Sequence, residues 1–163
     1  MKEPEFDPVG LLRALKEHRV RFVLIGGFAA ALRGSPLITG DLDICYARDA
    51  QNLERLATAL RALDARLRGG PDQDPFQLDA RTLEAGDHFT FMTTFGAFDC
   101  LGTPAGTEGF LALNASASDE TVEDTVIRVA SLDDLIAMKA AADRPHDRIA
   151  IEWLSALRDE TEN

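Results

Sequence analysis

The segment 22–46 places the strongest constraint on the fold, because it reads as a strand, a glycine pair, a short helix and a second strand in close succession. Residues 22–25 (FVLI) form an apolar run typical of a strand that is buried on both faces. Gly26 and Gly27 follow directly, and glycine lets a backbone turn sharply and approach a ligand closely. The Ala-rich segment 28–33 favours a short helix, whose first N–H groups would face a phosphate bound at the turn.

The second strand of this segment carries two carboxylates on one face. Side chains alternate along a strand, so Asp41, Asp43 and Cys45 share one face, and Leu42 and Ile44 share the other. Carboxylates two positions apart lie roughly 6–7 Å from each other and repel unless a cation lies between them. Mg²⁺ prefers such oxygen ligands, usually together with substrate phosphates. A glycine turn beside a carboxylate pair therefore favours phosphoryl or nucleotidyl transfer.

The Asp41-Leu42-Asp43 pattern taken alone is equally consistent with a solvated strand edge. Acidic residues number 28 of 163, so two of them separated by one residue are expected by chance roughly five times. The order of apolar strand, glycine pair, short helix and acidic strand is more informative than any one of these parts.

Composition indicates one soluble domain spanning 1–163, with 45% hydrophobic and 28% charged residues. The N-terminus lacks the apolar core of a signal peptide and no apolar run approaches a membrane span, so we expect a cytoplasmic protein without membrane contact. Cys45 and Cys100 are too few for a disulfide framework and are expected to be reduced. A net charge of −11 argues against binding of extended nucleic acid.

The remaining pattern predicts a helix capped by Asp7 that runs from Pro8 to near His18, and a long helix capped by Asp49 that runs to about Arg68. The arginines of the long helix (Arg55, Arg61, Arg66 and Arg68) are interpreted as a solvated face or, less readily, as a nucleic-acid contact. A polar turn is expected at 71–75, two or three strands within 76–101, and a strand at 124–130. Two helices follow, over 132–143 and from Pro145 onward, the second burying four apolar side chains: Ile149, Trp153, Leu154 and Leu157.

Two further charged residues lie in apolar surroundings. Asp99 falls inside a strand between Phe98 and Cys100, where a carboxylate is costly unless it is paired, bound to a metal or able to reach solvent at the strand end. Lys139 shares a helical stripe with Leu135 and other apolar residues, so its ammonium group either extends into water or meets a partner in the site.

The order of the first segment resembles the nucleotidyltransferases of the DNA polymerase β superfamily, whose motif is an apolar residue, Gly-Gly or Gly-Ser, and a spaced Asp-x-Asp. The C-terminal segment SLDDLIAMKAAADRPHDRIAIEWL has a lysine, Ala-rich residues and Arg-Pro-x-Asp in sequence. In this order it is similar to the small bacterial nucleotidyltransferases that include the AbiEii/MenT-like toxins.

This resemblance implies an α+β (α/β) nucleotidyltransferase fold, with a mixed, mostly antiparallel sheet backed by helices and two C-terminal helices. It implies that Asp41, Asp43 and Asp99 hold one or two Mg²⁺ ions, and that Lys139 acts with them in catalysis. It further implies that the nucleotide is bound by five residues: Gly26, Gly27, Lys139, Arg144 and Asp147. Gly27 stands where many members have Ser, so a phosphate contact there would come from the backbone N–H.

The implied reaction transfers an NMP from an NTP such as ATP to a hydroxyl acceptor, either an RNA end such as that of tRNA or a protein hydroxyl. A toxin–antitoxin component with an antitoxin protein as partner is part of the same resemblance. The alternative is a catalytically silent nucleotide-binding or toxin–antitoxin partner domain with the same fold. A purely structural domain would place Asp99 away from Asp41 and Asp43.

Overall fold

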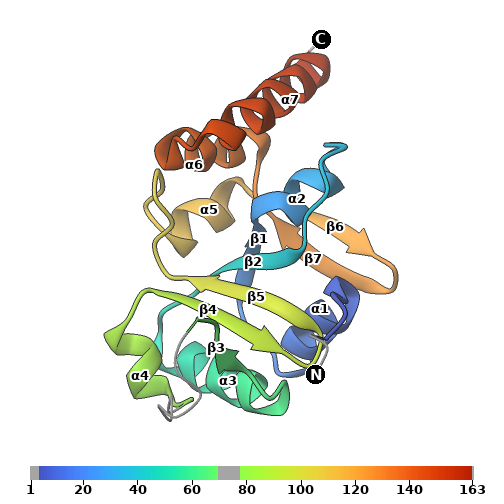
Figure 1. Cartoon of the computed structure of the whole chain (residues 1–163). Helices are drawn as coiled ribbons and strands as arrows, with labels where there is room; N and C mark the ends of the chain where they lie inside the picture. The colour runs from blue at the N-terminus through green and yellow to red at the C-terminus, as the bar shows by residue number, and fades with distance from the viewer. Residues whose placement is uncertain (1–3, 70–77, 163) are drawn as a thin grey trace.

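The computed structural model describes residues 4–69 and 78–162, which form one seven-stranded sheet with helices packed around it (Figure 1). The helices of this part of the chain are α1 (Pro8–Glu17), α2 (Gly26–Leu32), α3 (Ala50–Ala62), α4 (Ala80–Ala85), α5 (Phe110–Ser116), α6 (Leu132–Ala142) and α7 (Pro145–Glu162). The strands are β1 (Phe22–Ile25), β2 (Asp41–Tyr46), β3 (Arg66–Leu67), β4 (His88–Thr93), β5 (Gly96–Leu101), β6 (Ser118–Val122) and β7 (Thr125–Val129).

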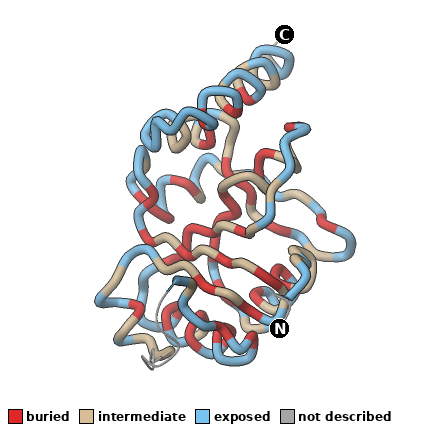
Figure 2. The backbone as a smooth tube through the Cα atoms, viewed as in Figure 1, coloured by how far each residue is buried: buried red, intermediate tan, exposed pale blue. Residues whose placement is uncertain are grey.

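The sheet is mixed and mostly antiparallel, as expected. Its strand order is β3-β4-β5-β2-β1-β7-β6. Only the β2–β5 and β1–β7 pairs are parallel. The antiparallel β1–β2 pair lies at the centre, and β1 is buried along its whole length. Figure 2 shows buried residues concentrated in these central strands, whereas the outer helices expose one face. The motif strands are therefore held rigidly on both sides.

The first and third helices begin at the predicted caps. Asp7 accepts a hydrogen bond from the Gly10 N–H at 3.0 Å, and Pro8 occupies the first helical position. Asp49 accepts from the Asn52 N–H at 3.1 Å. These caps satisfy N–H groups that have no partner inside the helix, and both helices pack on the sheet through leucine side chains.

The prediction that the long helix continues to about Arg68 is wrong, because α3 ends at Ala62. Asp64 adopts a left-handed conformation with φ of 52°, and the Ala65 N–H closes the helix end on the Leu60 carbonyl. The chain then forms the short edge strand β3, antiparallel to β4. Arg66 and Arg68 are therefore strand and turn residues, and this displacement brings Arg68 to the functional site described below.

The prediction of a strand over 76–84 is wrong for the described residues 78–84, where helix α4 forms instead. Asp79 caps the helix α4 by accepting a hydrogen bond from the Thr82 N–H at 2.8 Å, and Leu83 is fully buried. The cap and one buried leucine on a helical turn outweigh the alternation that favoured a strand. The expected turn at 71–75 lies outside the described residues.

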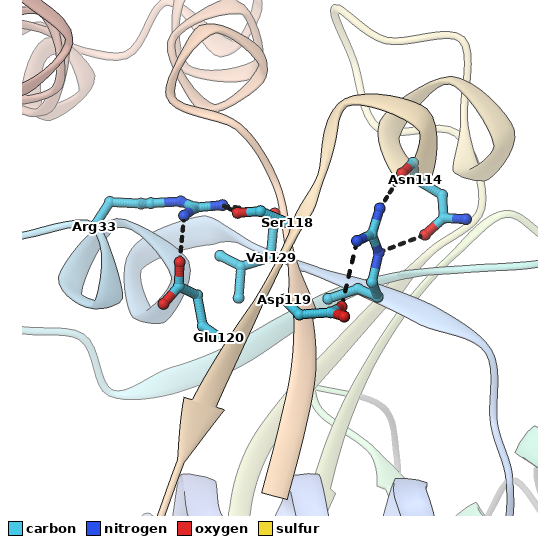
Figure 3. A network of polar contacts seen from close by, with 7 residues as sticks. Arg33, Asn114, Ser118, Asp119, Glu120 and Val129 are labelled. Atoms are coloured by element: carbon cyan, nitrogen blue, oxygen red, sulfur yellow. Dashed lines mark hydrogen bonds and ion pairs between the residues drawn. The ribbon is translucent and has the colours of Figure 1, made fainter. Parts of the chain in front are cut away.

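The β6–β7 hairpin forms the other sheet edge, and β6 was not predicted because its sequence SDETV is polar. Figure 3 shows Arg33, which follows α2, reaching Ser118 and Glu120 of β6. Its guanidinium also donates to the Val129 carbonyl at 2.9 Å. Arg128 donates to Asn114 of α5 in the same way, at 3.1 Å to the side-chain oxygen. These arginine contacts add polar links to a hairpin that also buries Val122, Ile127 and Val129 in the core.

The last two helices pack on each other and lie at one end of the molecule, with the C-terminus pointing away from the sheet (Figure 1). The predicted buried face of α7 is partly wrong. Leu154 is buried, but Ile149 is 55% exposed and Trp153 is 46% exposed. The helix instead turns Asp147 and Ala150 inward. None of the described helices is both long enough and apolar enough to cross a membrane.

Candidate active site

Three carboxylates meet on one face of the sheet. Asp43 of β2 and Asp99 of β5 are paired positions in parallel neighbouring strands, and Asp41 lies two residues before Asp43 on the same face. One oxygen of each carboxylate lies within 4.8 Å of the others. All three residues are half-buried. The sheet register therefore places acids that are distant in sequence around one small volume.

Gly26 is required at this cluster by both its conformation and its surroundings. Its φ of +74° is in the left-handed region, and a Cβ at this position would lie 2.0 Å from Asp43 Oδ2. The glycine pair forms the first turn of α2 instead of a separate turn before it. With seven residues, α2 is a short helix. Gly26 and Gly27 line the cavity. This exposure of their backbone, and not the end of a short helix, is the reason to expect a phosphate contact there.

Thr39 is a site residue that the sequence reasoning missed. Its hydroxyl is 3.1 Å from the Asp41 carbonyl oxygen and 3.2 Å from Asp41 Oδ1, so it orients the first carboxylate. A Cβ on Gly27 would come within 2.8 Å of the Thr39 side chain. The only sequence signal was a hydroxyl residue two positions before Asp41, which is common in loops.

Arg68 was also missed as a site residue. Its guanidinium forms an ion pair with Asp99 Oδ1. The helical interpretation of this region had placed Arg68 on a solvated face, and no local pattern indicates otherwise.

Asp147 lies at the centre of a group of cations on α6 and α7. Its side chain is fully buried and lies 3.4 Å from Lys139 Nζ and 2.8 Å from Arg144 Nε. The Arg144 N–H also donates to it, at 3.0 Å. Burial opposes ionisation, but the hydrogen bonds from Arg144 and the charge of Lys139 outweigh it and lower the pKa of Asp147 to about 2. The Lys139 side chain thus meets a partner, one of the two outcomes left open by its position.

The carboxylate cluster is electrostatically unfavourable without a cation. Burial, followed by repulsion from Asp41 and Asp99, raises the pKa of Asp43 to about 8. Burial also raises the pKa of Asp99, against the opposing effect of Arg68. Three oxygen donors that repel one another at this separation fit a hard divalent cation such as Mg²⁺. The donor set is therefore chemically suited to the metal that the resemblance implies.

The cluster opens into a cavity of about 1000 Å³. Seven of the residues proposed from the sequence line this cavity: Gly26, Gly27, Asp41, Asp43, Asp99, Lys139 and Arg144. Asp147 does not line the cavity itself, but it forms ion pairs with Lys139 and Arg144, which do. Asp87, a weaker candidate from the sequence for the third carboxylate, also lines the cavity, as do His88 and Thr103, which were not singled out. A cavity of this volume is in the size range of small-molecule binding sites.

The two cysteines are free and buried, as expected for reduced thiols. The Cys45 thiol lies 3.4 Å from the Gly102 carbonyl oxygen, to which it donates, and burial raises its pKa to about 12. Burial also raises the pKa of the Cys100 thiol. Neither sulfur is therefore activated as a nucleophile.

Solved structures with a similar fold include antibiotic adenylyltransferases. The lincosamide antibiotic adenylyltransferase LnuA, bound to lincomycin, matches with a TM-score of 0.63 and 16% identity over 94% of this chain and 99% of that chain. The antibiotic-resistance factor ANT(2'')-Ia in solution matches with a TM-score of 0.54 and 17% identity over 93% of this chain and 87% of that chain. Its complex with adenylyl-2''-tobramycin matches with a TM-score of 0.53 and 16% identity over 93% and 94% of the respective chains.

The fold expected from the sequence is thereby confirmed: the chain has the nucleotidyltransferase fold. At 16–17% identity the likeness shows the fold alone, and both the nucleotidyltransferase superfamily and the AbiEii/MenT-like assignment stay predictions. No protein-family model matches the sequence, and the comparison with curated proteins likewise finds no match.

Proposed function

We propose that the protein is a Mg²⁺-dependent nucleotidyltransferase that transfers an NMP from an NTP to a hydroxyl acceptor. The observation that carries this proposal is the meeting of Asp41, Asp43 and Asp99 beside Gly26, in a cavity that Lys139 also lines. Carboxylates that converge on a metal-binding geometry, beside a closely approaching backbone and a lysine, are suited to holding a triphosphate together with Mg²⁺.

In this proposal each group has a separate role. The carboxylates of Asp41, Asp43 and Asp99 hold one or two Mg²⁺ ions, and the Gly26 and Gly27 N–H groups face phosphate oxygens. Bound Mg²⁺ would neutralise the cluster, polarise the phosphates and lower the pKa of the acceptor hydroxyl.

Lys139 neutralises charge on the leaving pyrophosphate, and Asp147 positions Lys139. The acceptor hydroxyl loses its proton to solvent as a bond forms between its oxygen and the α-phosphorus, while the bond from that phosphorus to the bridging oxygen breaks and pyrophosphate leaves.

The net charge of the protein and the volume of its cavity limit the class of acceptor. The net charge of −11 and a cavity of about 1000 Å³ favour a small molecule or a single chain end over an extended nucleic acid. The similar structures of LnuA and ANT(2'')-Ia contain lincomycin and an adenylylated tobramycin, which are small molecules. A small hydroxyl compound is therefore a candidate acceptor, beside an RNA end and a protein hydroxyl. The toxin-like resemblance additionally implies an antitoxin protein as partner.

The test measures melting temperature with Mg²⁺ and each of the four NTPs. We expect one or more NTPs to stabilise the wild type only with Mg²⁺, and Asp43→Asn to abolish this stabilisation. Asp159→Asn is the matched control, because Asp159 is an exposed carboxylate on α7. An unchanged melting temperature of the wild type under all conditions would contradict the proposal.

Turnover is tested separately with α-labelled NTPs, Mg²⁺ and fractions of cellular RNA, protein and small molecules. Label transfer identifies the acceptor class. Stabilisation by an NTP without transfer to any fraction would instead favour the silent nucleotide-binding domain.

A further inference from the structure

Arg68 neutralises the carboxylate cluster. Its guanidinium contacts Asp99 Oδ1, and the two side chains are only 29% and 15% exposed. Among the described residues, no other arginine or lysine lies within ion-pair distance of Asp41, Asp43 or Asp99. Lys139 lines the same cavity, but its ammonium group is paired with Asp147. Arg68 is therefore the cation in direct contact with the metal-free cluster, whereas Lys139 acts on Asp43 from a longer distance.

The sheet itself places Arg68 beside Asp99. The Arg68 N–H donates to the Thr90 carbonyl at 2.9 Å, which continues the β3–β4 ladder beyond Leu67. Thr90 in turn is the antiparallel partner of Asp99. Residues opposite one another in neighbouring strands share a face, so Arg68, Thr90 and Asp99 form a row across three strands. The ion pair is thus determined by strand register.

We propose that Arg68 is the resting counter-ion of the carboxylate cluster and competes with the divalent cation for Asp99. The inference rests on the proposed function, because it concerns the same metal-binding carboxylates. A guanidinium on Asp99 Oδ1 and a divalent cation held by the three carboxylates repel each other strongly in a partly buried site. Cation binding therefore requires the guanidinium to leave Asp99. Arg68 acts through Asp99 and is a positioning residue.

The proposal predicts opposite effects on the metal-free and metal-bound protein. Replacing Arg68 by glutamine removes the counter-charge, so the metal-free protein should melt at a lower temperature. The same change removes the competitor, so Mn²⁺ or Mg²⁺ should bind more tightly, by on the order of tenfold in Kd. A residue with a merely structural role would weaken both states.

The experiment compares Arg68→Gln, Arg68→Lys and Arg66→Gln by titration calorimetry with Mn²⁺ and by thermal melting in EDTA at pH 7.5. Arg66 is the matched control because it lies two positions earlier and pairs with the exposed Asp64 at 3.7 Å. We expect Arg68→Gln to bind Mn²⁺ more tightly and to melt lower in EDTA. Arg68→Lys keeps the charge and should bind Mn²⁺ much as the wild type does, and Arg66→Gln should match the wild type in both measurements.

Equal or weaker Mn²⁺ binding by Arg68→Gln, beside normal binding by the wild type, overturns this inference and leaves the proposed function standing. Absence of Mn²⁺ binding by the wild type overturns both.

A second readout uses the wild type and does not depend on the folding of Arg68→Gln. The Arg68 Nε NMR signal, assigned by its loss in Arg68→Lys, should shift during a Mg²⁺ titration while that of Arg66 stays constant. A constant Arg68 signal through saturation contradicts displacement.

Discussion

At the scale of single residues, the geometry of the candidate site depends on close contacts that fix the positions of its side chains. Gly26 lies so close to Asp43 that any side chain would displace the carboxylate. Thr39 holds Asp41, and Asp147 holds Lys139 at 3.4 Å. Each proposed metal or phosphate contact is thus supported by a neighbour that fixes its position, as a site with defined geometry requires.

Replacement of Gly26 by alanine tests this arrangement. The new Cβ would meet Asp43 Oδ2 in a left-handed backbone, where a non-glycine residue costs about 1–2 kcal/mol before any clash is counted. We expect Gly26→Ala to lower stability by at least that amount and to remove stabilisation by Mg²⁺ and NTP, as measured by urea unfolding and thermal melting. Gly40→Ala is the control, since no atom lies within 4 Å of its added Cβ. Equal behaviour of the two variants would contradict the role assigned to Gly26.

At the scale of elements, polar side chains connect segments that lie far apart in the sequence. Arg33, next to α2, binds Glu120 of β6, as Figure 3 shows, and Arg128 of β7 binds Asn114 of α5. Asn52 of α3 does the same for the centre of the fold. It is 1% exposed, accepts from the Arg21 N–H at 2.7 Å and donates to the Ala47 carbonyl at 2.7 Å. One buried amide thus ties α3 to the segments entering β1 and leaving β2.

Asn52→Ala should therefore destabilise the protein strongly. It leaves the Arg21 N–H and the Ala47 carbonyl buried without their Asn52 partner, at about 1–3 kcal/mol for each group. We expect a loss of about 2–4 kcal/mol in the free energy of unfolding in urea, with an unchanged m-value. Gln51→Ala removes an exposed amide one residue earlier on the same helix and should stay within about 0.5 kcal/mol of the wild type. A loss below 1 kcal/mol for Asn52→Ala would contradict the structural role.

At the scale of the whole molecule, the stability of the fold is linked to the charge state of the site. The carboxylates lie on central and neighbouring strands, so their repulsion acts directly on the sheet. Burial and the neighbouring carboxylates raise the pKa of Asp43 to about 8 in the folded protein, whereas an unfolded chain has an ordinary value near 3.8. Between these pH values the folded state binds a proton that the unfolded state releases.

The sign of the pH dependence follows from this difference. The free energy of unfolding of the metal-free protein should fall as pH rises from about 5 to 8, by at most about 1.4 kcal/mol per pH unit for one proton. Saturating Mg²⁺ should abolish this slope, because the metal-bound folded state keeps Asp43 deprotonated, as the unfolded state does over the same pH range. Urea titrations at several pH values in EDTA and in Mg²⁺ measure both slopes, and Asp43→Asn should flatten the one in EDTA. A metal-free stability that rises over this pH range in the wild type would argue against the cluster.

Local chemistry allowed much of the molecule to be predicted from its sequence. The apolar run of β1, the glycine pair, the alternation of β2 and the caps Asp7, Asp49 and Ser131 all form as expected. Each depends on residues within one or two turns of chain. The family resemblance of these motifs, rather than local chemistry alone, indicated the fold class and named seven of the residues that line the cavity.

Only the tertiary structure decided what depends on contacts between distant segments. The parallel pairing of β2 with β5 places Asp99 beside Asp43, and the end of α3 at Ala62 brings Arg68 to Asp99. The inward turn of Asp147 on α7 is set by Lys139 and Arg144, against the apolar pattern of that helix. Strand register and ion pairing across the fold have no signature in a local window of sequence, because each is determined by which partner arrives from elsewhere in the chain.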